Sequence, residues 1–185
     1  MLLDTPVCDF GWKAPDFTLQ DASGASFTMR EQLGNKGLLI AFICNHCPYV
    51  QRIAGRLAAD TKQLMDEGVA VLAIMSNGYE NYAADSPANM QRFASQHGFL
   101  FPYLVDHDQS VGRRYGAICT PDFFGFNSSG ELQYRGRLDD ADERGVENRT
   151  PELVNAMQLI AATGQGPRAQ TPSMGCSIKW RDDNQ

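Results

Sequence analysis

Continuous apolar runs and helical spacing of apolar residues alternate in the first half of the chain. Leu38–Ile43 and Val69–Met75 are apolar throughout, which predicts two strands buried on both faces. Between them, apolar side chains recur at helical spacing from Pro48 to Glu67, and Gly68 follows, which predicts a helix that ends at this glycine. The apolar positions of that helix are Val50, Ile53, Ala54, Leu57, Leu64 and Met65. This strand–helix–strand unit predicts a parallel pair inside an α/β fold.

The segments on either side extend the unit into a mixed sheet. Residues 14–28 predict an N-terminal hairpin that turns at Ser23-Gly24, and residues 122–136 predict a second antiparallel hairpin. Further elements are predicted as helices over residues 87–97 and 108–115 and from Pro151 onward, and as a strand over 101–105. We expect one α/β domain over residues 1–185, with a core at about 14–162 and an irregular tail at 163–185.

Composition and charge limit the classes of protein to consider. The chain has 185 residues, is 43% hydrophobic and 21% charged, and carries a formal net charge of −6, which is typical of one globular domain. The negative charge argues against a nucleic-acid or anionic-membrane surface. The first residues carry no basic region and no signal-length apolar stretch, and no segment approaches a transmembrane span. We therefore expect a cytoplasmic monomer or homodimer with no membrane or nucleic-acid partner.

The cysteines carry the clearest chemical signal. They are Cys8, Cys44, Cys47, Cys119 and Cys176. An odd number in a chain without an export signal does not indicate a disulfide framework. The segment Cys44-Asn45-His46-Cys47-Pro48 follows the first apolar run directly, so two thiols meet where a buried strand should become a helix. This placement predicts reversible thiol redox chemistry that needs no cofactor.

Helix geometry predicts which thiol attacks. Proline is best tolerated at the first helical position, so Pro48 makes Cys47 the N-cap residue. The free N–H groups and positive dipole end of a helix stabilise a thiolate there. Cys44 precedes the helix and is expected to be the partner of the nucleophile Cys47. His46 is expected to favour a thiolate by charge or hydrogen bonding, the alternative being a solvated side chain that fills the turn.

The motif and its setting resemble a known fold. The order of elements, the Cys44-x-x-Cys47 motif at the first strand–helix junction and Thr120-Pro121 before the second hairpin are similar to the thioredoxin fold. More narrowly, they resemble peroxiredoxin-like and thioredoxin-like (AhpC/TSA-type) redoxins with an Asn-His pair inside the motif. The resemblance implies a thioredoxin-like three-layer sandwich with a cis-proline at Pro121. It also implies that Thr120 and Pro121 border the groove that receives the substrate backbone.

Two features depart from the peroxiredoxin pattern. Ile40 stands where its motif has a proline, and Cys44 stands where it has a threonine. The arginine with which that family polarises peroxide has no unambiguous match here. The candidates are Arg113, Arg114, Arg135 and Arg137. Without such donors, stabilisation of a breaking O–O bond is not secured by the sequence.

The remaining cysteines allow more than one interpretation. Cys119 lies beside the Thr-Pro pair and is either a third redox partner or a small buried hydrophobe. Cys176 lies in the tail, which could fold back and bring it to the site as a resolving thiol. The isolated Ile178 and Trp180 predict that this tail docks on the domain. Cys8 has no supporting context.

Two enzymatic functions are consistent with these residues. In the first, Cys47 attacks a protein or small-molecule disulfide, Cys44 resolves the mixed disulfide, and an unidentified thiol reductant restores the pair. In the second, Cys47 attacks a hydroperoxide and becomes a sulfenic acid, which Cys44, Cys119 or Cys176 resolves.

A metal-binding or redox-sensing module is the third possibility. Its ligands would be Cys44, His46 and Cys47 with His97, His107 or Cys119. The sequence has no second closely spaced ligand pair, so no dedicated metal is expected. A solvated acidic loop without phosphate or metal is expected at Asp139, Asp140, Asp142 and Glu143.

Overall fold

The two buried apolar runs form the centre of the larger sheet. In the computed structural model, which describes residues 1–141 and 146–181, they become β4 (Leu38–Phe42) and β5 (Ala70–Met75). These strands pair in parallel, with Leu38 opposite Ala70, and α2 (Pro48–Asp66) connects them. Every residue of β4 is buried. The predicted strand–helix–strand unit is therefore confirmed.

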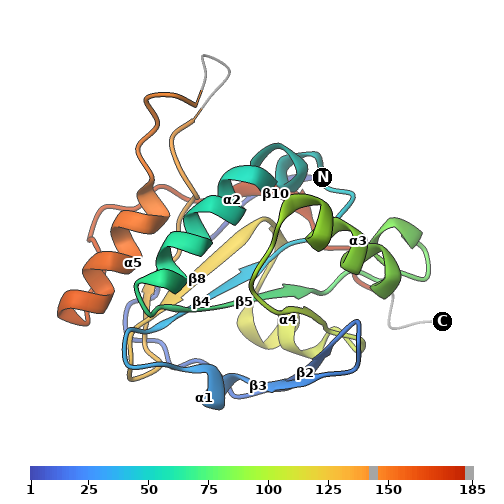
Figure 1. The fold of residues 1–185 in the computed structure, drawn as a ribbon, viewed down its shortest axis with the longest axis horizontal. Coiled ribbons are helices and arrows are strands. Elements are labelled where there is room, and N and C mark those ends of the chain that lie inside the picture. Colours follow the sequence, from blue (N-terminus) through green and yellow to red (C-terminus); the bar gives the residue numbers. More distant parts are fainter. Residues whose placement is uncertain (142–145, 182–185) are drawn as a thin grey trace.

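Five further strands complete a seven-stranded mixed sheet (Figure 1). They are β2 (Thr18–Asp21), β3 (Ser26–Thr28), β6 (Tyr103–Val105), β8 (Asp122–Phe126) and β9 (Leu132–Tyr134). The order is β3-β2-β6-β5-β4-β8-β9, in which β4, β5 and β6 are parallel and the other pairings are antiparallel. Both predicted hairpins, β2–β3 and β8–β9, are present.

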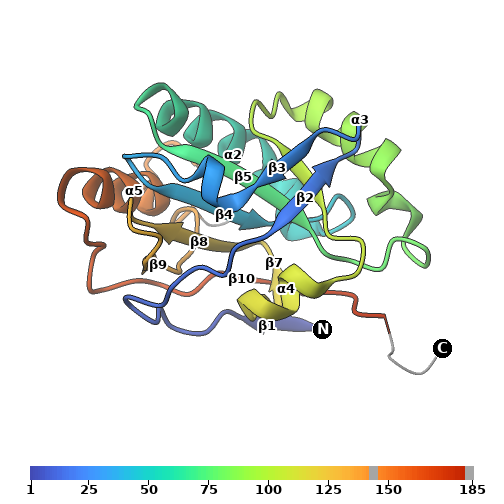
Figure 2. The same cartoon turned by 90° about the horizontal axis from the view of Figure 1, so that it is seen from below.

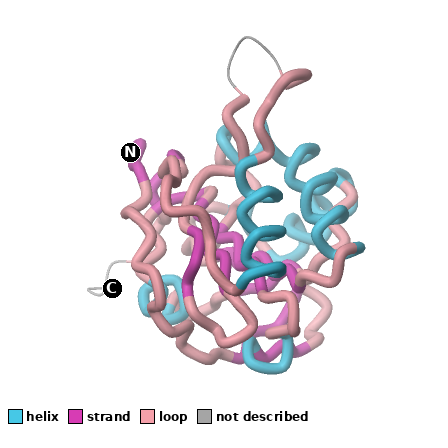
Figure 3. The backbone as a smooth tube through the Cα atoms, turned by 90° about the vertical axis from the view of Figure 1, so that its left-hand side faces the viewer, coloured by secondary structure: helices cyan, strands magenta, loops and turns pink. Residues whose placement is uncertain are grey.

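Helices cover the two faces of this sheet unequally (Figures 2 and 3). One face carries α2, α3 (Pro87–His97) and α5 (Glu152–Thr163), and the other carries the short α4 (Ser110–Tyr115). The short α1 (Met29–Gln32) and the 3-10 turn η1 (Ala83–Asp85) lie in connecting segments. Each face has its own apolar core, so the predicted three-layer sandwich is confirmed. No described helix is both long and apolar enough to cross a membrane.

The C-terminal tail differs from the irregular segment predicted for residues 163–185. Residues Met174–Ser177 form β10, which pairs with β1 (Leu2–Asp4) on one edge and with β7 (Cys119–Thr120) on the other. These strands are two to four residues long and their partners are distant in sequence, so no local periodicity reveals them. The predicted docking of the tail is confirmed, because Ile178 is only 4% exposed in the apolar core on the face of the sheet that carries α4.

The predicted solvated acidic loop is wrong at its first residue. Asp139 is buried and accepts hydrogen bonds from Arg56 Nε at 2.7 Å and from Arg149 at 3.1 Å. Arg149 also pairs with Asp60 of α2, so the segment before α5 is attached to α2 by buried charge pairs. Asp142 and Glu143 lie outside the described residues.

The glycine just before β4 provides a test of how closely β4 and β8 pack. Gly37 has φ +94°, and a Cβ there would lie 2.3 Å from the carbonyl oxygen of Phe126. Gly24 has a similar φ of +89° with nothing within 4 Å. Gly24→Ala should cost about 1–2 kcal/mol of the free energy of unfolding, through the left-handed backbone alone. Gly37→Ala should cost more, because β8 must also move. Equal losses in urea unfolding of the two variants would contradict this packing.

Candidate active site

Two buried thiols meet at the junction of β4 and α2. Cys47 is the N-cap residue of α2, with Pro48 in the first turn, as predicted from the sequence. Its side chain is 0% exposed and that of Cys44 is 1% exposed. No disulfide joins the two cysteines in the structure. The dithiol is therefore buried, in the apolar core on one face of the sheet.

Hydrogen-bond donors surround the sulfur of Cys47. The pKa of this thiol is lowered to about 4, first because the Cys44 thiol donates a hydrogen bond to it. The backbone N–H groups of Val50 and Cys176 and the hydroxyl of Thr120 act in the same direction, and burial opposes them. When Cys47 is protonated, its thiol instead donates to the carbonyl oxygen of Thr120 at 3.1 Å. The donors outnumber this acceptor, so the thiolate is the form that the site favours.

Cys44 has the opposite character. Its pKa is raised, first by the hydrogen bond to Cys47, then by burial and by the negative charge of Asp85. Its sulfur also lies 3.3 Å from the hydroxyl of Thr120. The two sulfurs therefore hold one proton between them, and this proton is on Cys44 while Cys47 is ionised. When Cys47 becomes part of a disulfide, its thiolate is gone. The hydrogen bond that raises the pKa of Cys44 most is then lost.

A buried carboxylate positions the turn between the cysteines. Asp85, at the end of η1, is 0% exposed. Its Oδ1 accepts the backbone N–H of Asn45 at 2.7 Å and that of His46 at 3.2 Å. Its Oδ2 accepts the amide of Asn77 at 2.8 Å and lies 2.6 Å from Nδ1 of His46. No periodicity or motif around Asp85 predicts this role, and sequence reasoning missed it.

The asparagine inside the motif is also bound on all sides. The side chain of Asn45 donates to the carbonyl of Ala84 at 2.8 Å and accepts the hydroxyl of Tyr103 at 3.1 Å. Its backbone carbonyl accepts the amide of Gln51, one turn into α2, at 2.8 Å. The turn is therefore connected to η1, to β6 and to α2, which holds both cysteines in place.

The imidazole of His46 is directed to Asp85 rather than outward. Besides the contact through Nδ1, the ring stacks on Tyr82 with centroids 5.2 Å apart and an interplanar angle of 12°. Its side chain is 26% exposed. The alternative prediction, that His46 is a solvated side chain that fills the turn, is therefore only partly correct. Nδ1 of the ring contacts the buried carboxylate of Asp85. A direct effect of His46 on the thiolate stays a prediction.

The Thr120–Pro121 peptide bond is cis, as predicted. Thr120 contacts both thiols, through its hydroxyl and its carbonyl. Pro121 lines a cavity of about 340 Å³ together with Tyr49, Arg52 and Ile53 of α2 and with Met174 of β10. The edge of Thr120 itself pairs with β10. Pro121 therefore lies in the wall of a cavity, whereas the backbone of Thr120 is covered by its pairing with β10.

The other cysteines separate into two groups. Cys119 is buried and precedes Thr120 on β7, so its side chain faces away from the dithiol. Burial raises its pKa to about 12, and its thiol donates to the carbonyl of Pro121 at 3.7 Å. Burial also raises the pKa of Cys8 to about 11. Cys176, by contrast, lies on β10 opposite Thr120.

The four candidate arginines have other partners. Arg135 forms a buried pair with Asp122 at 2.8 Å, and Arg137 pairs with Glu152 at 2.6 Å. Arg114 donates to the carbonyl of Asp16 at 3.0 Å. Arg113 lies over the ring of Trp180, with 4.8 Å to the centroid. These contacts explain the conformations of the four side chains without a role at Cys47.

One group of side chains has the donor atoms of a metal site. Among the described residues, Cys44, His46 and Asp85 offer ligand atoms within 4.8 Å of one another. His97 and His107 do not join this group, since His97 packs on Phe93 and His107 contacts Tyr79. The carboxylate of Asp85 is already occupied by hydrogen bonds from the turn. A metal would have to displace the contacts that hold the two cysteines in place.

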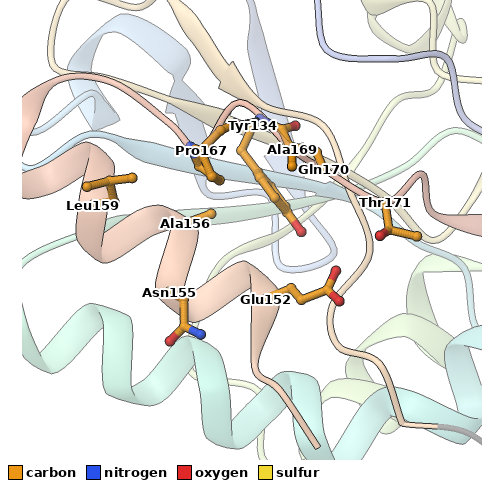
Figure 4. A pocket seen from close by; sticks show the side chains of 9 residues that line it. All are labelled: Tyr134, Glu152, Asn155, Ala156, Leu159, Pro167, Ala169, Gln170 and Thr171. Carbon is orange, nitrogen blue, oxygen red and sulfur yellow. Dashed lines mark hydrogen bonds between the residues drawn. The ribbon is translucent and has the colours of Figure 1, made fainter.

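A separate cavity of about 380 Å³ lies between α5 and the segment that follows it (Figure 4). Glu152 of α5 and Tyr134 of β9 point into it, and Pro167 and Thr171 line it on the side that faces α5. Both polar side chains already have partners, because Tyr134 donates to the carbonyl of Arg137 and Glu152 pairs with Arg137. None of the cysteines lines this cavity.

Comparisons with known proteins agree with the fold that carries this site. The model of the AhpC/TSA family matches residues 10–135. A crystal structure of an uncharacterized conserved protein from Geobacillus kaustophilus is 37% identical, with a TM-score of 0.90 over 98% of this chain and 97% of that one. The thiol-disulfide oxidoreductase ResA of Halalkalibacterium halodurans is 28% identical over 70% of this chain and 69% of its own length. A protein of Mycobacterium tuberculosis with a peroxiredoxin name is 25% identical over 83% of this chain and 87% of its own.

The lowered pKa of Cys47 predicts an unusual pH profile of alkylation. Because the pKa falls from 9.0 to about 4, the thiolate persists until the pH drops through about 4. The rate with iodoacetamide should therefore be nearly constant between neutral pH and about pH 5, and should be lost below. The reaction at low pH should be absent from Cys47→Ser. A rate that keeps rising with pH into the range of ordinary thiols would contradict the assigned thiolate.

Asp85 should be needed to hold the turn. Asp85→Asn leaves the shape but weakens the acceptors of two backbone N–H groups, so the free energy of unfolding should fall by about 1–3 kcal/mol. Alkylation of Cys44 in the same variant should become faster, because the negative charge that raises its pKa is gone. Asp21→Asn is the matched control, since Asp21 also accepts two backbone N–H groups but is partly exposed. Equal effects of the two substitutions would contradict the role of Asp85.

Proposed function

The chain belongs to the AhpC/TSA family of thioredoxin-like redoxins, and we propose that it is a thiol–disulfide oxidoreductase that cycles Cys44 and Cys47 between dithiol and disulfide. The observation that supports this most is the division of roles between the two sulfurs. One is held as a thiolate by donated hydrogen bonds, and the other keeps its proton. Thiol–disulfide exchange needs a nucleophile and a resolving thiol of this kind.

The reaction proceeds in two exchanges. The Cys47 thiolate attacks one sulfur of a substrate disulfide, forms a mixed disulfide and releases the other half as a thiolate. Cys44 has then lost its hydrogen-bonded anion, so its pKa falls, its proton leaves, and its sulfur attacks Cys47 Sγ. The second half of the substrate leaves as a thiol. The protein ends as the Cys44–Cys47 disulfide, which an external thiol reductant returns to the dithiol.

The surroundings of the dithiol favour a small disulfide over an extended peptide. A peptide substrate would add to a free strand edge, but the edge of Thr120 is paired with β10. The cavity beside Pro121 combines apolar walls from Tyr49, Ile53 and Met174 with charged side chains of both signs, among them Arg52 and Asp4. Its volume of about 340 Å³ suits a small molecule. We propose a low-molecular-weight disulfide as the substrate class.

Hydroperoxide reduction is the second candidate function. It is favoured by the family model and by relatives with peroxiredoxin names, and by the proline that follows Cys47. In that case Cys47 takes one peroxide oxygen as sulfenic acid, and Cys44 condenses with it to the same disulfide and releases water. The arginines that such chemistry would use have other partners here, so disulfide exchange is the primary proposal.

Trapping of the mixed disulfide tests the order of attack. With oxidised glutathione, Cys44→Ser should form a glutathione adduct on Cys47 that outlives the adduct in the unaltered protein, because Cys44 is absent and cannot resolve it. Cys47→Ser should show no adduct on Cys44 over the same time, because the pKa of Cys44 is raised by burial and by Asp85 even without its partner. Cys8→Ser is the matched control and should behave as the unaltered protein. Rapid adduct formation on Cys44 instead of Cys47, read by peptide mass, would contradict the proposed roles.

A further inference from the structure

A third thiol lies over the pair. Cys176 on β10 is directly opposite Thr120 on β7 in an antiparallel ladder. Directly opposite residues of such a ladder project their side chains from the same face. The hydroxyl of Thr120 contacts the sulfur of Cys44 at 3.3 Å on that face. The side chain of Cys176 therefore points to the dithiol, and it packs against the core that contains Cys44 and Cys47.

Several contacts hold β10 in this place. A Cβ on Gly175 would lie 2.0 Å from the carbonyl oxygen of Thr120, so only glycine allows the strand to approach so closely. The hydroxyl of Ser173 donates to the carbonyl of Pro121 at 2.8 Å. Beyond the strand, Ile178 is buried in the apolar core on the face of the sheet that carries α4. The tail is thus positioned on the thiol site from both ends of β10.

The chemistry of Cys176 complements that of Cys47. The backbone N–H of Cys176 favours the Cys47 thiolate. Burial raises the pKa of Cys176, and a hydrogen bond between its thiol and Cys47 adds to the effect. Cys176 therefore stays protonated while Cys47 is ionised. It is also partly exposed, unlike Cys44 and Cys47, so it lies on the solvent side of the pair.

We propose that Cys176 is a second resolving thiol, which forms a Cys47–Cys176 disulfide between α2 and β10. This inference rests on the proposed function, in that Cys47 must first form a mixed disulfide. The sulfur of Cys176 then loses its proton and attacks Cys47 Sγ, and the substrate thiolate leaves and takes up the proton. Cys44 can attack the same Cys47 sulfur afterwards, which gives the Cys44–Cys47 disulfide and returns Cys176 to a thiol. All oxidising equivalents come from the substrate disulfide.

The Cys44→Ser protein isolates this step. After oxidised glutathione is added and removed, the glutathione adduct on Cys47 should decay, and one intramolecular Cys47–Cys176 disulfide should replace it. In Cys44→Ser/Cys176→Ser the adduct should persist at least about tenfold longer, because no thiol remains to attack it. Cys44→Ser/Cys8→Ser is the matched control, since Cys8 is also partly buried with a raised pKa, and it should behave as Cys44→Ser. Peptide mass under non-reducing conditions identifies each species.

The outcomes separate this inference from the proposed function. An adduct that forms on Cys47 but lives equally long with and without Cys176 would overturn only the second resolving thiol. A disulfide from Cys47 to Cys119 would also overturn it. Absence of any adduct on Cys47 would overturn both proposals together.

Gly175 gives a second measurement that leaves all thiols in place. Gly175→Ala in the Cys44→Ser background should slow formation of the Cys47–Cys176 disulfide, because the added methyl group pushes β10 away from Thr120. Formation of the first adduct on Cys47 should slow less, because only one of the donors to Cys47, the backbone N–H of Cys176, moves with β10. Gly55→Ala, on α2 with nothing within 4 Å of its Cβ, is the control and should leave both steps unchanged. Unchanged transfer in Gly175→Ala would count against a role for the close approach of β10.

Discussion

A thiolate under the protein surface must be stabilised by donated hydrogen bonds, and this requirement explains most of the site. The causes that lower the pKa of Cys47 are the Cys44 thiol, two backbone N–H groups and a hydroxyl, with no cationic side chain among the main ones. Such donors act only over hydrogen-bond distances. The start of α2, the cis-proline segment and β10 must therefore all lie close to one sulfur. Asp85 contributes indirectly, since it holds the turn from which α2 starts.

The fold supplies these donors from segments that are far apart in the sequence. β4 ends at the centre of the sheet and α2 begins there, which places the free N–H groups of the helix at Cys47. β8 follows the cis-proline and pairs with β4, so Thr120 is brought beside both cysteines. The tail returns across the molecule and places the N–H and thiol of Cys176 on the remaining side. The same convergence gives Cys47 two neighbouring thiols.

The sequence predicted those parts of the molecule that depend on local pattern. The apolar runs gave β4 and β5, helical spacing gave α2, and Pro48 correctly predicted Cys47 as the N-cap. β1 and β10 were not predicted, because each is only three or four residues long and pairs with a partner more than 160 residues away. Asp85 was missed for a similar reason. Its partners lie about 40 residues earlier, and a lone aspartate in a short turn carries no periodic signal.

The central claim is that Cys47 is a thiolate prepared for disulfide exchange, and stopped-flow kinetics of the fully reduced protein test it most directly. The rates with a small disulfide and with hydrogen peroxide should be measured on the same preparation, beside Cys47→Ser. We expect a fast reaction with the disulfide that is lost in the variant, and a peroxide rate no greater than that of an ordinary thiolate. A peroxide rate orders of magnitude above that of a free thiolate, also lost in Cys47→Ser, would contradict the claim and identify a peroxidase.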